Sequence, residues 1–241
     1  MKKLICSILF YLTAHVAAAT AIVVIVTPQY ILLGTDSKRQ VLDANAVVQA
    51  NQQVCKIQTV GGYYFALAGF TSSQASGYSA SQIVAKQLQQ AASYETAISN
   101  IKQELKNILA KELKQRQQQQ PAAFAQLLST DEPLLELVVL RLQNGVPQME
   151  IIGFEKGAGS QVAVGSYTSR CPGDCPPGSQ QIYFMGSYSG MEHFLAQQRP
   201  FTEPAVLVKQ LIMEQAKVTP SSVGAPVNMV RFSADGTVWI K

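Results

Sequence analysis

The chain has 241 residues, a length that suits one large domain with a sizeable core. Hydrophobic residues make up 47% of it and charged residues 14%, and the formal net charge is +4. Lys and Arg do not cluster with interleaved aromatic residues, so this composition argues against a nucleic acid partner.

The first 19 residues have the pattern of a secretory signal peptide. Lys2 and Lys3 precede an apolar stretch from Leu4 to Leu12, and Ala17-Ala18-Ala19 forms an A-x-A cleavage site. An uncleaved anchor is the alternative, because apolar residues continue as far as Leu33, but polar residues and Pro28 interrupt that stretch. We therefore expect a leader at 1–19, one domain at 20–241, a secreted or periplasmic location and no stable membrane anchor after cleavage.

Cleavage at this site would make Thr20 the first residue of the mature protein. An N-terminal threonine carries a hydroxyl nucleophile together with an α-amine whose pKa of about 7.7–8.0 lets it serve as the base. Thr20 is thus a candidate catalytic residue. Exported proteins often begin with a small polar residue, however. The residues that follow Thr20 are therefore needed to decide whether it is catalytic.

Two apolar runs follow Thr20 and are separated by a Pro28-Gln29 turn, which predicts a hairpin of two strands buried on both faces. This hairpin would bring Asp36 back beside Thr20. A polar, alanine-rich connection, Val41 to Gln53, comes next. The run from Val54 to Val60 then predicts a strand that carries Lys56, and Gly61-Gly62 turns the chain into a strand ending at Ala68-Gly69. Strand alternation points Cys55 away from Lys56, which predicts a buried Cys55.

The middle of the chain alternates between helical and strand patterns. Residues 74–118 have helical periodicity, with a break near Tyr94-Glu95-Thr96, and the glutamine-rich segment 115–120 is a solvated helix end. Asn144-Gly145 predicts a hairpin between 134–142 and 148–154. The segment from 157 to 180, rich in Gly and Pro, predicts a long surface loop or an irregular hairpin.

A strand at 181–185, helices at 189–199 and 203–218, and a hairpin turning at Asp235-Gly236 complete the predicted elements. Pro204 falls in a first helical turn, where its missing N–H is tolerated. Strands and amphipathic helices in these blocks predict an α+β fold of two stacked sheets with helices on both outer faces.

The cysteines and histidines give no sign of a metal or cofactor. In an oxidising compartment, Cys171 and Cys175 predict a disulfide that closes a short loop. His193 would be the only histidine left after leader cleavage, which makes zinc improbable, and we interpret it as a surface or packing residue. Phosphate-loop, dinucleotide-binding and nucleophile-elbow motifs are absent from the sequence.

These residues, in this order, resemble the proteasome β-subunit family and its bacterial ATP-dependent relatives among the N-terminal nucleophile (Ntn) hydrolases. The matching positions are Thr20, Gly34 with Asp36-Ser37, Lys56-Ile57, Ala68-Gly69 and the segment 183–190 that contains Ser187. The resemblance covers nearly the whole mature chain. It implies a four-layer αββα sandwich, a homo-oligomer, and amide-bond hydrolysis of a peptide or small amide through an acyl-enzyme on Thr20.

The resemblance also implies a role for each site residue. Lys56 would favour the neutral amine and the threonine alkoxide, and Asp36 would keep this lysine charged and oriented. Gly69 would donate its backbone N–H to the oxyanion. Ser187 would bind the amine or a relaying water, although it also suits an N-cap of the following helix.

Two positions depart from the family pattern. No aspartate is present near Pro220, at the end of the last helix, where Ser222 is a candidate for the family serine, and Phe70 occupies a position that usually has a small residue, which would reshape the substrate cleft. These departures leave two alternatives open. One is a non-catalytic, ring-forming or binding subunit, and the other is an amidase or acyltransferase that acts on a small molecule.

Overall fold

A computed structural model describes residues 20–42, 48–73, 76–130, 132–157, 162–176, 178–197 and 203–240. The predicted leader, residues 1–19, lies outside these ranges. In the described part of the chain, no helix is long and apolar enough to cross a membrane.

The first main sheet is antiparallel and contains the N-terminal hairpin. Its strands lie in the order β12 (Gln181–Gly186), β1 (Ala21–Val26), β2 (Tyr30–Asp36), β13 (Val227–Ser233) and β14 (Gly236–Ile240). All six residues of β1 are buried, which explains its uninterrupted apolar sequence. The predicted hairpin at Pro28-Gln29 and the predicted closing hairpin at Asp235-Gly236 are both confirmed.

The second main sheet is also antiparallel, in the order β11 (Val164–Cys171), β10 (Val146–Lys156), β9 (Leu135–Gln143), β6 (Tyr63–Gly69) and β5 (Gln58–Val60). Asn144 and Gly145 have φ values of 53° and 76° at the predicted β9–β10 turn, as a primed hairpin turn requires. The segment 157–180, predicted as a long loop or an irregular hairpin, contains the regular strand β11. Because this edge strand is partly exposed along its length, it lacks the apolar run that would have revealed it.

Two predictions about the chain around Lys56 are wrong. The polar connection contains a hairpin of β3 (Lys38–Leu42) and β4 (Val48–Gln53), and β5 begins only at Gln58, so Lys56 precedes the strand. Since no strand alternation acts on this segment, Cys55 is exposed and not buried. A further short hairpin pairs β7 (Ser72–Ser73) with β8 (Tyr78–Ser79).

Five helices are present in the described ranges: α1 (Ala80–Gln90), α2 (Tyr94–Gln119), α3 (Pro121–Leu128), α4 (Ser189–Ala196) and α5 (Pro204–Val218). Ser79 and Ser93 cap α1 and α2 with their side chains. The predicted break between the first two helices exists, but it lies just before Tyr94. Pro204 occupies the first turn of α5, as predicted. Helix α3 was not predicted, and it begins directly at a proline after α2 has ended.

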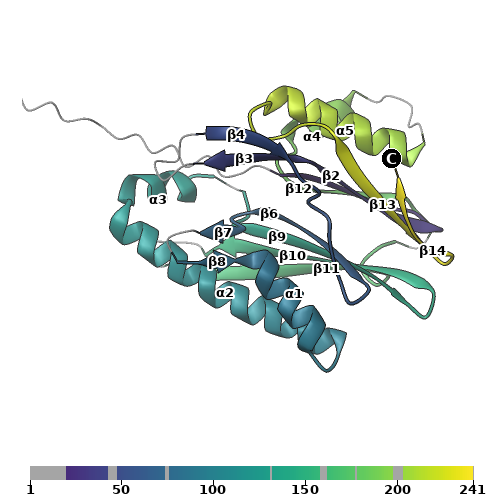
Figure 1. Cartoon of the computed structure of the whole chain (residues 1–241), viewed down its shortest axis with the longest axis horizontal. Coiled ribbons are helices and arrows are strands. Elements are labelled where there is room, and N and C mark those ends of the chain that lie inside the picture. Colours follow the sequence, from purple (N-terminus) through teal and green to yellow (C-terminus); the bar gives the residue numbers. More distant parts are fainter. Residues whose placement is uncertain are drawn as a thin grey trace, which may run out of the picture.

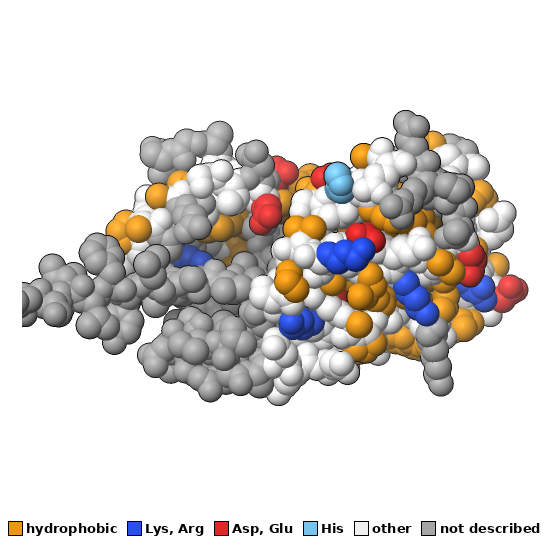
Figure 2. Space-filling view, turned by 90° about the horizontal axis from the view of Figure 1, so that it is seen from above, with side chains coloured by type: hydrophobic (Ala, Val, Ile, Leu, Met, Phe, Trp, Pro, Cys, Tyr) orange, Lys and Arg blue, Asp and Glu red, His pale blue; other side chains and the backbone are white. Residues whose placement is uncertain are grey.

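Three apolar clusters hold the elements together, and Figure 1 shows the arrangement. One lies between α1, α2 and the second sheet, one between the two sheets, and one between the first sheet and the α4–α5 pair. The α+β class with two main antiparallel sheets is therefore present. Seen from the α4–α5 side, the surface mixes hydrophobic and charged side chains (Figure 2), and Val206 and Met213 of α5 are exposed there.

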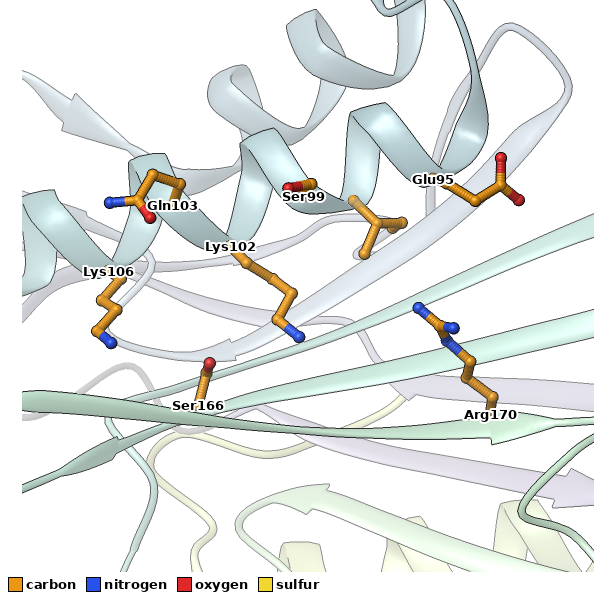
Figure 3. A pocket seen from close by; sticks show the side chains of 8 residues that line it. Glu95, Ser99, Lys102, Gln103, Lys106, Ser166 and Arg170 are labelled. Carbon is orange, nitrogen blue, oxygen red and sulfur yellow. The ribbon is translucent and has the colours of Figure 1, made fainter.

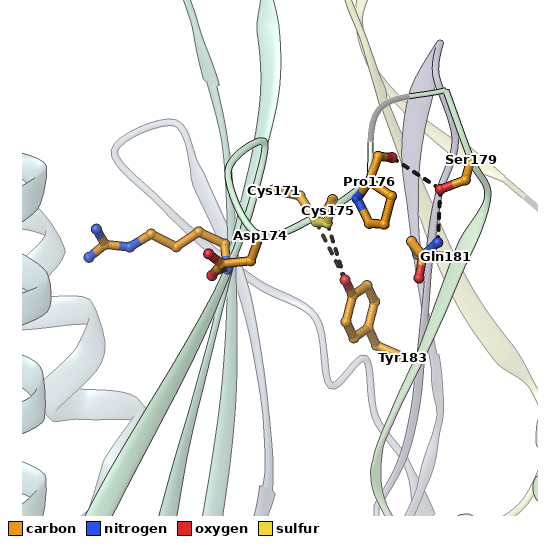
Figure 4. Close-up of a disulfide and its surroundings, with 8 residues drawn as sticks. Cys171, Asp174, Cys175, Pro176, Ser179, Gln181 and Tyr183 are labelled. Atoms are coloured by element: carbon orange, nitrogen blue, oxygen red, sulfur yellow. Dashed lines mark hydrogen bonds between the residues drawn. A yellow bond between two sulfur atoms is a disulfide. The ribbon is translucent and has the colours of Figure 1, made fainter.

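The predicted disulfide between Cys171 and Cys175 is present at the end of β11 (Figure 4). The Tyr183 hydroxyl lies 3.1 Å from the Cys175 sulfur and 3.7 Å from that of Cys171. Asp174, inside the loop, accepts a hydrogen bond from the Arg170 N–H at 2.8 Å. The loop is therefore held by noncovalent contacts as well as by the covalent bond.

We expect the loss of this disulfide to change stability little. The two cysteines are only 4 residues apart, so chain-entropy arguments give a contribution of about 2 kcal/mol. The double variant Cys171→Ser/Cys175→Ser should therefore lower Tm by less than about 8 °C in a thermal melt. A larger fall would show that the bond orders more than its own loop. Alkylation and mass spectrometry without reductant should find neither thiol free in the wild-type protein.

Candidate active site

Thr20 lies immediately before β1, and the β1–β2 hairpin brings Asp36 beside it. The register pairs Ile22 with Thr35, so the end of β2 meets the start of β1. Asp36 accepts a hydrogen bond from the Ala21 N–H through Oδ1 at 3.0 Å. Thr20 is 7% exposed. The continuous apolar strands thus deliver both polar residues to one end of the sheet.

Asp36 is fully buried and serves as the acceptor at the centre of the site. Its Oδ1 accepts from Lys56 Nζ at 2.8 Å, while Oδ2 accepts from the backbone N–H groups of Lys38 at 3.0 Å and Gly224 at 3.4 Å. Burial raises the pKa of the Asp36 carboxyl group, and Lys56 and the N–H donors oppose this increase.

Lys56 connects Asp36 to Thr20. Its Nζ lies 2.8 Å from Asp36 Oδ1 and 3.3 Å from Thr20 Oγ1, and its side chain is 13% exposed. Burial lowers the pKa of the lysine, and the attraction of Asp36 opposes this decrease. The ammonium group is therefore directed at the threonine hydroxyl from a poorly solvated position.

Ser187 lies on the other side of Thr20, directly after β12. Its backbone N–H donates to the Thr20 carbonyl oxygen at 3.0 Å, and the residue is half-buried. The N-cap role considered for Ser187 is wrong. Tyr188 occupies the N-cap position of helix α4, and its side chain makes no capping hydrogen bond. Ser187 consequently contacts Thr20 through its backbone.

Gly69 ends β6 in the second sheet and has φ +93°, a conformation that favours glycine. A Cβ there would lie 2.6 Å from the Leu134 carbonyl oxygen. The neighbouring Ala68 and the Thr20 carbonyl both lie against Gly186, which sequence analysis did not identify. The end of β6 is thus packed beside the start of β1.

The structure shows where the residues at the two departures from the family pattern lie. Phe70 packs its ring on the helix side, under the Arg116 guanidinium at 4.4 Å, while Tyr78 donates its hydroxyl to the Phe70 carbonyl at 3.1 Å. Ser222 is buried, and its hydroxyl donates to Thr219 O at 3.5 Å. It is the backbone of Gly224 that reaches the site, through Asp36 and through its carbonyl, which accepts from Ser37 N–H.

Other polar features lie apart from this cluster. His193 is exposed on α4, and the described residues hold no group of three or more metal-ligating side chains. A cavity of about 340 Å³ lies between α2 and β11 (Figure 3), where Lys102 and Lys106 of the helix and Arg170 of the strand line it. Its lining includes none of the residues around Thr20.

Comparisons with known proteins give matches to solved structures only. No protein-family model and no curated protein matches the chain. The chain is similar to the Gly-1 mutant of Anbu from Hyphomicrobium sp. strain MC1, with 13% identity, a TM-score of 0.48, and coverage of 92% of this chain and 86% of that chain. A second Anbu structure from the same strain gives 13% identity, a TM-score of 0.44, and coverage of 92% and 87%. With identity this low, these matches assign no role to Thr20, Asp36 or Lys56.

Proposed function

We propose that this chain is an exported threonine-type hydrolase that cleaves peptide or small amide bonds through an acyl-enzyme on Thr20. The observation that carries the proposal is the chain of contacts from Asp36 through Lys56 to the Thr20 hydroxyl, at 2.8 and 3.3 Å. The proposal has two further parts. The helix–sheet–sheet–helix order is the αββα sandwich of Ntn hydrolases, and the protein is a homo-oligomer.

The first half of the reaction transfers the acyl group to the threonine. The Thr20 oxygen attacks the amide carbon while its proton passes to the free α-amine, and the Lys56 charge stabilises the developing alkoxide. The Gly69 N–H donates to the tetrahedral oxyanion. The C–N bond then breaks, the amine proton moves to the leaving nitrogen, and an ester on Thr20 remains.

Water completes the reaction in the second half. The Thr20 amine accepts a proton from the attacking water, and the resulting tetrahedral species expels the threonine oxygen, which regains that proton. The carboxylic acid leaves and the enzyme is regenerated. Both halves require a free amine, which exists only after cleavage of the Ala19–Thr20 bond, so export would also activate the enzyme.

We expect the exported protein to begin at Thr20. Its intact mass should correspond to residues 20–241, and Edman degradation should give Thr-Ala-Ile-Val-Val. This form should react with a peptide epoxyketone, which requires both the hydroxyl and the amine of an N-terminal threonine. The same chain produced with its leader attached is the control and should not react.

The outcomes separate the proposed hydrolase from its main alternative. A mature protein that starts one residue earlier or later would exclude this mechanism, because the amine would then lie on another residue. A mature protein that starts at Thr20 and still fails to react would favour the non-catalytic binding subunit. Reaction with small amides but not with peptides would identify an amidase.

A further inference from the structure

The site is divided between the two main sheets. Thr20 and Asp36 lie at the ends of β1 and β2, and Ser187 follows β12, all in the first sheet. Gly69 ends β6 of the second sheet. Because catalytic groups must be held within about 0.5 Å of their productive positions, a contact that ties the sheets together here would affect the chemistry directly.

Glu136 makes such a contact. It lies in β9, directly opposite Ala68 in the sheet register, and is 6% exposed. Its Oε2 accepts a hydrogen bond from the Gly186 N–H of the other sheet at 2.7 Å. Its Oε1 accepts from the Tyr167 hydroxyl of β11 at 3.1 Å. A carboxylate of the second sheet thus holds the end of β12.

The Gly186 N–H has a topological reason to need this acceptor. Among the described residues β12 is an edge strand that pairs with β1 alone, so the N–H groups on its outer side have no described strand to bind. Gly186 also packs directly against the Thr20 carbonyl oxygen, and the next N–H, of Ser187, donates to that oxygen. Glu136 is therefore two contacts from Thr20.

The carboxylate is costly to bury, and the described residues supply no lysine or arginine in an ion pair with it. Burial raises the pKa of its carboxyl group, while the Gly186 and Tyr167 donors oppose the increase and Glu132 adds to it. The pKa of Tyr188 is raised by burial and by nearby carboxylates including Glu136. Buried carboxylates without a cation are uncommon in structural roles and concentrate at functional sites.

We propose that Glu136 is a positioning residue, which fixes Gly186 and Ser187 against β6 and so holds the Thr20 carbonyl and the Gly69 N–H in register across the two sheets. The proposal rests on the hydrolase function above. In this role Glu136 does not contact the substrate. Its removal should slow the acylation step and leave substrate binding unchanged.

The test compares Glu136→Gln with wild type in epoxyketone labelling. Glutamine keeps the shape of the side chain but loses its charge, and hydrogen bonds to charged groups are the stronger ones. We expect kinact to fall roughly 10- to 100-fold, as small misplacements of catalytic groups do, with KI unchanged. Rates are normalised to the active fraction from end-point labelling. A variant that is only less stable is then not mistaken for one that reacts slowly with the epoxyketone.

Glu150→Gln is the matched control, because Glu150 is also a buried carboxylate of the second sheet, 2% exposed, but its partner is Arg170 of β11. It should label at the wild-type rate. Tyr167→Phe removes only one of the two hydrogen bonds and should give a smaller loss of kinact. If Glu136→Gln does not fold, Tyr167→Phe decides. If the deciding variant has the kinact of the wild type, Glu136 is not a positioning residue.

Amide hydrogen exchange separates this proposal from the hydrolase itself. Glu136→Gln should speed exchange at Gly186 and Ser187 about tenfold or more, and exchange in α5 should not change. If wild type does not label but this local exchange does increase, the hydrolase fails and the inter-sheet contact stands. Unchanged exchange at Gly186 would overturn the contact whatever the labelling result.

Discussion

Replacement of Lys56 by alanine should reduce epoxyketone labelling of the mature protein by at least about 10²–10³-fold, the loss seen when one preorganised electrostatic contact is removed. The lysine ammonium lies 3.3 Å from the Thr20 hydroxyl in a poorly solvated position, where its charge lowers the cost of forming the alkoxide. Rapid mixing followed by intact-mass analysis measures the rate.

Two controls accompany this substitution. Lys217→Ala, on the exposed face of α5, removes a lysine that pairs with Glu214 and should label normally. Lys38 is unsuitable as a control because its side chain packs against Gly224, whose backbone N–H binds Asp36. Since Lys56→Ala leaves a buried carboxylate without its cation, Lys56→Arg is also needed. It keeps the charge but places it differently, and it should remain folded while labelling slowly. Labelling of Lys56→Ala at the wild-type rate would exclude the proposed role.

The substitution Gly186→Ala should abolish labelling and lower the thermal stability as well. Gly186 has φ +75°, which costs a residue with a side chain about 1–2 kcal/mol. A Cβ here would also meet the Thr20 carbonyl oxygen, and it would lie 2.9 Å from the Ala68 Cβ. The backbone of Thr20 would have to move.

Gly178 provides a matched control. It has the same φ of +75°, yet a Cβ there would meet nothing within 4 Å. Gly178→Ala should therefore show the conformational cost alone, as a modest fall in Tm with normal labelling. Equal behaviour of the two variants in labelling would mean that the contact between Gly186 and Thr20 is irrelevant to the reaction.

The sequence was most informative where chemistry and periodicity agreed. The buried runs on either side of Pro28 leave no alternative to a hairpin, and its length fixes Asp36 beside Thr20. The Asn144-Gly145 and Asp235-Gly236 turns were recognisable because few residues accept positive φ. Helices α1, α2 and α5 followed from their apolar spacing, and the start of α5 from Pro204 in its first turn.

Misassigned or missed features depend on long-range contacts or carry weak local signals. Val54, Ile57 and Val60 recur at every third position, which does not fit strand alternation, and the assignment of Lys56 to a strand overlooked this. Edge strand β11 is partly exposed and needs few apolar residues. Gly224 reaches Asp36 through its backbone alone, which no residue pattern reveals. Glu136 does have a local signal in the sequence, because it is a charged residue within an apolar strand.

The β3–β4 hairpin has a consequence for how this architecture can diverge. The chain enters it at Lys38, whose N–H binds Asp36, and leaves it at Val54, whose N–H binds the Ser37 carbonyl at 2.8 Å. Both ends are thus fixed at the site itself, independently of the length of chain between them. Insertions and deletions in this hairpin are therefore tolerable without displacing Lys56. Related proteins can therefore differ in the number of residues between the aspartate and the lysine. A sequence search that requires a fixed number of residues there would miss such relatives.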